Sequence, residues 1–123
     1  MAASYELVFI GTCPPPIGRP FGGPIAPQFA AGTRFPLEVG RRLVLGRGKT
    51  SDIVVESLIA ARNHVAVTLE LAGDAATLVV SNLGAGRGAY SAGKYFDDQV
   101  RIAPGQQFEM GGVLVFEFQR TDP

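Results

Sequence analysis

Short runs of apolar residues alternate with polar ones or end at glycine along most of the chain. In the clearest run, residues 64–71 (HVAVTLEL), every second side chain from Val65 is apolar, which places them on one face of a strand. No window of eleven or more residues keeps a helical period of 3.6. The pattern predicts strands over residues 5–10, 34–39, 42–46, 52–55, 64–71, 76–81, 107–110 and 113–118.

Glycine-containing turns separate these strands at short and regular intervals. Gly73-Asp74 and Gly111-Gly112 each lie between two apolar runs, a pattern that favours a β-hairpin. Residues 58–62 (LIAAR) are long enough for only one helical turn. Many short strands joined by such turns are typical of an all-β, antiparallel β-sandwich, and residues 1–123 are enough for one domain.

Residues 11–32 interrupt this pattern with a long segment rich in proline and glycine. We expect an inserted loop between the first two strands. Its large apolar residues are four apart, but intervening prolines prevent a continuous helix: Ile17, Phe21, Ile25 and Phe29, with Pro20, Pro24 and Pro27. We expect these apolar residues to pack on the sandwich surface or on a partner, and residues 12–31 to be dispensable for folding.

Composition narrows the classes of function. The 123 residues include 11 Lys and Arg against 11 Asp and Glu, so no positive excess favours nucleic acid or an anionic membrane. The sequence contains no stretch of about 18 apolar residues, so it predicts no membrane insertion. The first residues also lack the basic segment that begins a secretory signal. We therefore expect a soluble, cytoplasmic protein. With one cysteine (Cys13) and one histidine (His64), we expect no disulfide, no metal site and no cofactor.

Two motifs resemble nucleotide sites but lack their context. Gly48-Lys49-Thr50 resembles the end of a P-loop, but position 43 is leucine and a strand follows in place of a helix. Residues 84–89 (GAGRGA) match a loose dinucleotide pattern that is also without a following helix. His64 has no predicted nucleophile or carboxylate beside it, which favours a structural role. The sequence thus predicts a protein that is not an enzyme.

Several basic residues occupy turns and strand ends: Arg41, Arg42, Arg47, Lys49, Arg62 and Arg87. If these turns converge at one end of the sandwich, they form a positive pocket, to which Thr50 and Ser51 would add hydroxyl donors. Such a pocket suits a phosphate or carboxylate on a peptide. The alternative is that these side chains are separate, solvated loop tips.

Four motifs in order resemble the forkhead-associated (FHA) domain family. They are Leu45-Gly46-Arg47, then Ser51-Asp52-Ile53-Val54-Val55 followed by Ala61-Arg62-Asn63-His64, then residues 82–93 (NLGAGRGAYSAG), and finally residues 100–111 (VRIAPGQQFEMG) before the last strand. The resemblance covers about residues 34–120, with 5–10 as the first strand. It implies an FHA-like sandwich that binds phosphothreonine peptides at the loops of one end.

The resemblance carries roles to single residues. Arg47 matches the arginine that reaches the phosphate, Arg62 the arginine of a Ser-Arg pair, and His64 the histidine that shapes the loop. Gly46, Gly88 and Gly93 match structural glycines. Four positions depart from the pattern: Ala61 replaces the phosphate-binding serine, Arg87 an asparagine that grips the peptide, Ala85 a loop Ser or Thr, and Ala92 the asparagine before Gly93.

These observations lead to one main hypothesis and two alternatives. The main hypothesis is a protein-interaction module that binds a protein partner, with a phosphothreonine-containing or acidic segment, through Arg47, Lys49, Thr50, Ser51, Arg62 and Arg87, its phosphothreonine dependence weakened or lost. One alternative is a structural subunit with contacts through the proline-rich loop or a sandwich face. The other is a genuine phosphothreonine reader that uses Arg47, Arg62 and Arg87.

Overall fold

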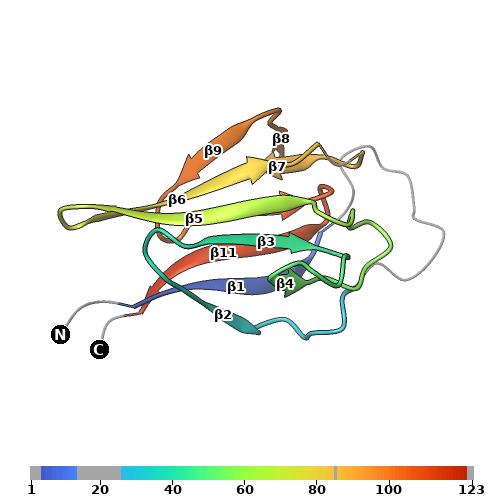
Figure 1. Cartoon of the computed structure of the whole chain (residues 1–123), viewed down its shortest axis with the longest axis horizontal. Coiled ribbons are helices and arrows are strands. Elements are labelled where there is room, and N and C mark those ends of the chain that lie inside the picture. Colours follow the sequence, from blue (N-terminus) through green and yellow to red (C-terminus); the bar gives the residue numbers. More distant parts are fainter. Residues whose placement is uncertain (1–3, 14–25, 85, 122–123) are drawn as a thin grey trace.

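Two β-sheets packed face to face form the body of the molecule (Figure 1). The computed structural model describes residues 4–13, 26–84 and 86–121. Its strands are β1 (Ser4–Thr12), β2 (Arg34–Leu37), β3 (Arg42–Gly46), β4 (Ile53–Val54), β5 (Val65–Ala72), β6 (Ala75–Asn82), β7 (Ala89–Ser91), β8 (Lys94–Tyr95), β9 (Gln99–Ile102), β10 (Gln107–Met110) and β11 (Leu114–Thr121). The described residues include no helix that could cross a membrane.

The strand order places the first and last strands side by side. One sheet runs β2-β1-β11-β10-β7-β8 and the other β4-β3-β5-β6-β9. β1 and β11 pair antiparallel from Ser4 opposite Thr121, with a bulge between Phe9 and Gly11. The all-β sandwich is confirmed, with one correction. β3 and β4 pair parallel, because the chain between them turns back before it re-enters the sheet at Ile53.

The core lies between the two sheets and follows the predicted alternation. Val65, Val67 and Leu69 of β5 are buried, as expected. Leu71 is 45% exposed, however, because β5 extends beyond the opposite sheet at the β5–β6 hairpin. Other large side chains that are fully buried come from β1, β3, β6, β10 and β11: Leu7, Leu45, Leu78, Phe108, Met110, Leu114, Phe116 and Phe118.

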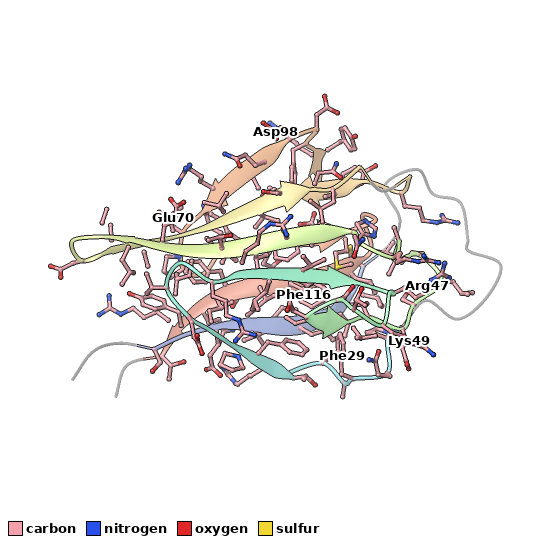
Figure 2. The ribbon with its side chains drawn as sticks, in the orientation of Figure 1. Phe29, Arg47, Lys49, Glu70, Asp98 and Phe116 are labelled. Atoms are coloured by element: carbon pink, nitrogen blue, oxygen red, sulfur yellow. The ribbon has the colours of Figure 1, made fainter. Side chains whose placement is uncertain are left out.

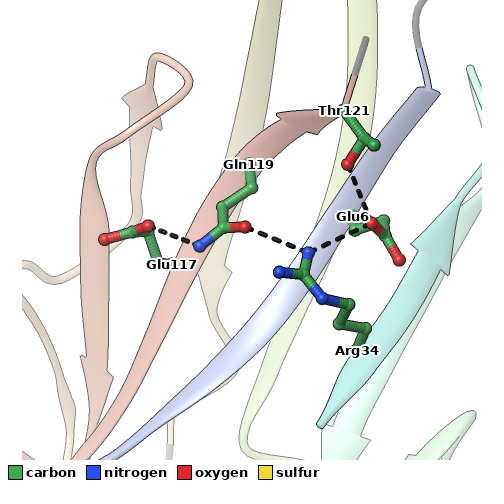
Figure 3. Close-up of polar contacts among 5 residues, drawn as sticks. All are labelled: Glu6, Arg34, Glu117, Gln119 and Thr121. Atoms are coloured by element: carbon green, nitrogen blue, oxygen red, sulfur yellow. Dashed lines mark hydrogen bonds and ion pairs between the residues drawn. The ribbon is translucent and has the colours of Figure 1, made fainter. Parts of the chain in front are cut away.

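A network of polar side chains crosses one face of the β1 sheet (Figure 3). The Arg34 guanidinium donates to Glu6 Oε1 at 3.2 Å and to Gln119 Oε1 at 3.1 Å. Gln119 donates in turn to Glu117 Oε2 at 2.7 Å, and the Thr121 hydroxyl donates to Glu6 at 2.9 Å. The network joins β2, β1 and β11, and therefore fixes the edge strand β2 to the body of the sheet.

The sequence pattern did not predict three strands and misplaced two features. β7, β8 and β9 were not expected: β7 and β8 are too short to show alternation, whereas β9 (QVRI) alternates over four residues and was missed. β2 ends at Leu37, and Val39 forms only an isolated bridge with Leu69. Residues 58–62 form no helical turn: the Ala60 N–H donates to Ser57 O at 3.1 Å, which makes a simple turn.

The proline-rich segment is anchored at its C-terminal end. Residues 14–25, which include Ile17, Phe21 and Ile25, lie outside the described residues. Phe29 packs edge-on against Phe9 at 5.1 Å and Phe35 at 5.2 Å. The Gln28 amide donates to Val54 O at 2.8 Å, and its oxygen accepts from Glu56 N–H at 2.9 Å. Phe29 therefore packs on the sandwich, as expected, at the edge of its core. That residues 12–31 are dispensable for folding stays a prediction.

Candidate functional site

The loops that follow β3 and β4 are joined by backbone hydrogen bonds at one end of the sandwich. The Arg47 N–H donates to Ala61 O at 2.8 Å, and the Gly48 N–H donates to Arg62 O at 3.0 Å. The Ser51 hydroxyl donates to the same Arg62 oxygen at 3.0 Å. Because Arg47 and Arg62 belong to these two bonded loops, their backbones are held side by side.

The absence of side chains at Gly46 and Gly48 permits this close approach. A Cβ added at Gly46 would overlap the carbonyl oxygen of Arg62, and one at Gly48 would collide with the Arg62 side chain. The structural role expected for Gly46 therefore has a steric cause, and Gly48 shares it.

His64 connects the second of these loops to a third. Its side chain is fully buried. The ring Nδ1 accepts from the Ala61 N–H at 3.0 Å, and Nε2 lies 2.6 Å from Gly88 O. Since a carbonyl can only accept, Nε2 carries the proton and the ring is neutral. Burial lowers the pKa of His64, partly offset by the hydrogen bond to Gly88.

A basic surface pocket of about 430 Å³ lies on the joined loops. It is lined by Arg47, Gly48, Lys49, Thr50 and Arg62, with no carboxylate among these residues. Figure 2 shows Arg47 and Lys49 at the end of the molecule where β3 finishes. The ion pairs between described residues lie elsewhere and join Arg34 with Glu6, Arg41 with Glu38, and Arg101 with Glu70. We call the hollow lined by the five residues Arg47, Gly48, Lys49, Thr50 and Arg62 the Arg47 pocket.

The predicted convergence of basic residues is therefore partial. Arg41 and Arg42 do not contribute, because Arg42 begins β3 at the end of the sandwich opposite Arg47. Arg87 is exposed near the turn at Gly111 and is not among the pocket residues. Ala85 lies outside the described residues.

Two other expected site residues, Ser51 and Ala61, make hydrogen bonds that hold the loop backbone in place. Ser51 is only 8% exposed, and its hydroxyl is engaged with Arg62 O, so it supports the loop. Ala61 uses both its N–H and its carbonyl in bonds to His64 and Arg47, and its methyl group supplies no donor. Of the two hydroxyl side chains expected at the pocket, that of Thr50 is exposed and lines it.

Ala92 and Gly93 lie at a different hollow. They form the β7–β8 turn with φ of 52° and 77°, and Ala92 is the non-glycine residue with positive φ among those described. The Glu109 carboxylate accepts from the Gly93 N–H at 3.0 Å. Burial raises the pKa of Glu109, partly offset by the hydrogen bonds from Gly93 and Ala92. The turn lines a separate cavity of about 790 Å³ and does not contribute to the Arg47 pocket.

Sequence reasoning missed Tyr95 and Gln28, which contact the loops described above. The Tyr95 ring lies over Gly88, so that an added Cβ there would come within 2.7 Å of it, and Tyr95 is 54% exposed. Gln28 fixes the chain that leads from β4 into the Ala61 loop. The Tyr95 contact depends on the β7–β8 hairpin, which is too short to show a pattern in the sequence. The Gln28 contacts depend on how two distant segments cross.

Comparison with known proteins supports the fold. No protein-family model matches the sequence, and neither does any curated protein. Solved structures match at low identity. The FHA domain of the CT664 protein from Chlamydia trachomatis superposes with a TM-score of 0.66 at 17% identity, over 94% of this chain and 96% of that one.

Two further matches were solved with peptides bound. EmbR of Mycobacterium tuberculosis, in complex with a low-affinity phosphopeptide, gives a TM-score of 0.68 at 20% identity, over 98% of this chain but 25% of that one. The MEK1 FHA domain, in complex with a phosphothreonine peptide of HOP1, gives 0.62 at 15%, over 73% of this chain and 90% of that one. With its two sheets and their loops in this arrangement, the chain has the fold of a forkhead-associated domain.

Proposed function

We propose that this protein is a non-enzymatic interaction module that binds a phosphorylated segment of a partner protein at the Arg47 pocket. The observation that carries the proposal is the pocket itself. Arg47, Lys49 and Arg62 line one hollow together with the hydroxyl-bearing Thr50 and without a carboxylate. A phosphate oxygen is the ligand that such a set of donors binds most strongly.

The pocket is organised before any ligand arrives. Hydrogen bonds from Arg47 and Gly48 to the Ala61–Arg62 backbone fix its two walls, and the His64 ring fixes the second wall to Gly88. A preformed site does not have to order its loops on binding, which favours affinity for a short peptide. The EmbR and MEK1 structures, which have the same fold, hold phosphopeptides.

Selectivity for phosphothreonine is expected to be weak. The methyl group of Ala61 offers no hydrogen bond, and a hydrogen bond to a charged group is worth roughly 1.5–3 kcal/mol. Its loss corresponds to an affinity about ten- to a hundred-fold lower. Arg87 adds a guanidinium near this end, which favours phosphate or carboxylate without distinguishing threonine from serine.

Calorimetric titration with phosphothreonine, phosphoserine and unphosphorylated forms of one peptide library tests this function. We expect weak binding that requires the phosphate, falls with salt, and is lost in Arg47→Ala. Arg41→Ala, at the other end of the sandwich, is the matched control and should bind like the wild type. The double variant Ala61→Ser with Arg87→Asn should bind phosphothreonine peptides more tightly. Equal binding of phosphorylated and unphosphorylated peptides would contradict the proposal.

The alternative of a structural subunit that binds through residues 11–32 has less support. Within the described part of this segment, Gln28 and Phe29 contact the sandwich of their own chain. A pulldown with a variant that lacks residues 14–25 separates the two functions, since only the structural function depends on that segment.

A further inference from the structure

Thr50 lines the Arg47 pocket, and its hydroxyl is also a group that a protein kinase could phosphorylate. Its side chain is exposed, in the turn formed by Lys49 and Thr50. We propose that Thr50 is a phosphorylation site, and that its phosphate occupies the Arg47 pocket of the same chain and excludes a partner's phosphopeptide. Only the exclusion of the peptide rests on the proposed function; the modification and the internal capture do not.

Of the neighbouring hydroxyls, Thr50 alone is available to an enzyme. Ser51 is 8% exposed, its hydroxyl donates to Arg62 O at 3.0 Å, and its N–H donates to Gly48 O at 3.0 Å. These bonds hold the residues on both sides of Thr50 and leave its own side chain at the surface. The structure thus distinguishes two adjacent hydroxyls by burial.

The sequence around Thr50 suits a protein kinase that recognises basic substrates. Arg47 lies three residues before the acceptor and Lys49 one residue before it. A kinase with acidic residues in its substrate groove selects such a charge pattern. In the reaction, the Thr50 Oγ1 forms a bond to the γ-phosphorus of a nucleoside triphosphate, the bond from that phosphorus to the β-γ bridging oxygen breaks, and the nucleoside diphosphate leaves. The hydroxyl proton passes to the kinase's catalytic base.

The surroundings of Thr50 favour capture of the new phosphate within the chain. A phosphothreonine carries about −1.5 to −2 charge at neutral pH and three strong acceptor oxygens. Arg47, Lys49 and Arg62 line the same pocket as Thr50, and the ion pairs between described residues do not involve them. An internal ligand acts at an effective concentration of order millimolar, so a partner peptide at lower concentration must bind more tightly to displace it.

The modification is tested on the full chain with a purified kinase that selects arginine three residues before its acceptor, together with a nucleoside triphosphate. We expect a gain of one phosphoryl group in intact mass, assigned to Thr50 by fragmentation and absent from Thr50→Ala. Failure to phosphorylate Thr50 under conditions that phosphorylate a peptide of residues 44–54 would overturn the proposal.

Capture is measured without any peptide, by phosphorus NMR of the phosphorylated protein. We expect the second pKa of the phosphate to lie below its usual value of about 6, because the pocket stabilises the dianion, and to return toward that value in phosphorylated Arg62→Ala. An unshifted pKa in the phosphorylated wild type would mean that the phosphate points into solvent. That result would overturn internal capture whether or not the protein binds phosphopeptides.

Exclusion is measured by titrating phosphopeptide into phosphorylated and unphosphorylated protein. We expect affinity to fall at least about tenfold on phosphorylation. Thr50→Glu should weaken binding more than Ala75→Glu, which adds the same charge at the β5–β6 hairpin on the opposite end. Equal affinity of both forms would refute the exclusion and leave the proposed function intact. If neither form binds phosphopeptide, the proposed function and the exclusion fail together, while capture stands on the NMR result.

Discussion

The His64 ring and the carbonyl of Gly88 are joined by a buried contact of 2.6 Å, although 24 residues separate them. The same ring accepts from the Ala61 N–H on its other side. A single neutral imidazole therefore fixes the distance between the loop after β4 and the loop before β7. The Arg47 pocket lies between the loop after β3 and the first of these loops, which supplies Arg62, so its shape depends on a residue that makes no contact with solvent.

Replacement of His64 should destabilise the protein and deform the pocket together. His64→Ala leaves the Ala61 N–H without its acceptor, and an unsatisfied buried group costs about 1–3 kcal/mol. It also removes one of two hydrogen bonds to the Gly88 carbonyl, which still accepts from the Gly111 N–H at 2.9 Å, and it leaves a cavity where the buried ring stood. We expect the free energy of unfolding in urea to fall by about 2–4 kcal/mol. Lys49→Ala, on the exposed side of the same pocket, should leave stability near that of the wild type. Equal losses in both variants would contradict the role given to His64.

The lowered pKa of His64 predicts that the protein loses stability in mild acid. The unfolded chain binds a proton on His64 below about pH 6.5, whereas burial keeps the folded ring neutral to lower pH. The contribution of His64 is therefore complete above about pH 6.5 and is lost as the pH falls toward the lowered folded pKa.

Glu109 changes stability with pH in the direction opposite to His64, so the two contributions must be measured separately. Its raised pKa means that its contribution is greatest at low pH and is lost as the pH rises through that value. Urea unfolding of the Glu109→Gln variant between about pH 5 and about pH 8 measures the part of the pH dependence of stability that comes from His64. If the acid-side loss is the same in a Glu109→Gln background with and without His64, the assignment to His64 is wrong.

The β7–β8 turn holds a strained alanine whose replacement should stabilise the fold. Ala92 has φ of 52°, a left-handed conformation that asparagine adopts more readily. We expect Ala92→Asn to raise the free energy of unfolding by about 0.5–1 kcal/mol. Ala75→Asn, at an exposed position with ordinary φ, should give no gain. A loss of stability in Ala92→Asn would show that the methyl group has a packing role.

Gly46 should tolerate no side chain. A Cβ there would overlap the Arg62 carbonyl, whereas nothing lies within 4 Å of a Cβ at Gly86. We expect Gly46→Ala to push the two loops apart and weaken phosphopeptide binding, with a loss of stability of about 1–3 kcal/mol from overpacking. Gly86→Ala is the control and should fold and bind normally. Wild-type behaviour of Gly46→Ala would contradict the close approach of the loops.

Two parts of the proline-rich segment should behave differently. Phe29 packs against Phe9, Phe35 and Phe116, so Phe29→Ala should cost about 1–3 kcal/mol, less than for a fully buried phenylalanine. Replacing residues 14–25 with a short Gly-Ser linker should change the melting temperature little. Thermal unfolding of both variants measures this, and a large loss from the linker variant would show that residues 14–25 contribute to folding.

The strands that build the core could be predicted because their side chains alternate over several residues. The prediction for residues 42–46 has the bounds of β3, and 107–110 those of β10. β7 and β8 have only three and two residues, too few for a period to appear, and their place depends on the pairing of β7 with β10 and of β8 with β7. The direction of β4 could not be predicted from the sequence either, because its parallel pairing with β3 depends on the path of the loop between them.

The candidate site could be predicted in part for a similar reason. Arg47, Lys49, Thr50 and Arg62 meet because consecutive strand ends lie at one edge of the sandwich, which the order of strands indicates. The burial of Ser51 and the place of Arg87 depend on how loops fold over one another. No local pattern in the sequence carries that information.

The central claim is that the Arg47 pocket receives the phosphate of a partner peptide. Titration of isotope-labelled protein with one phosphothreonine peptide, followed by amide chemical shifts, tests it most directly. We predict that the largest shifts fall on Arg47, Gly48, Lys49, Thr50 and Arg62, and that the unphosphorylated peptide leaves these amides unchanged. Shifts centred on the separate hollow at Ala92 and Gly93, or the same shifts with the unphosphorylated peptide, would contradict the claim.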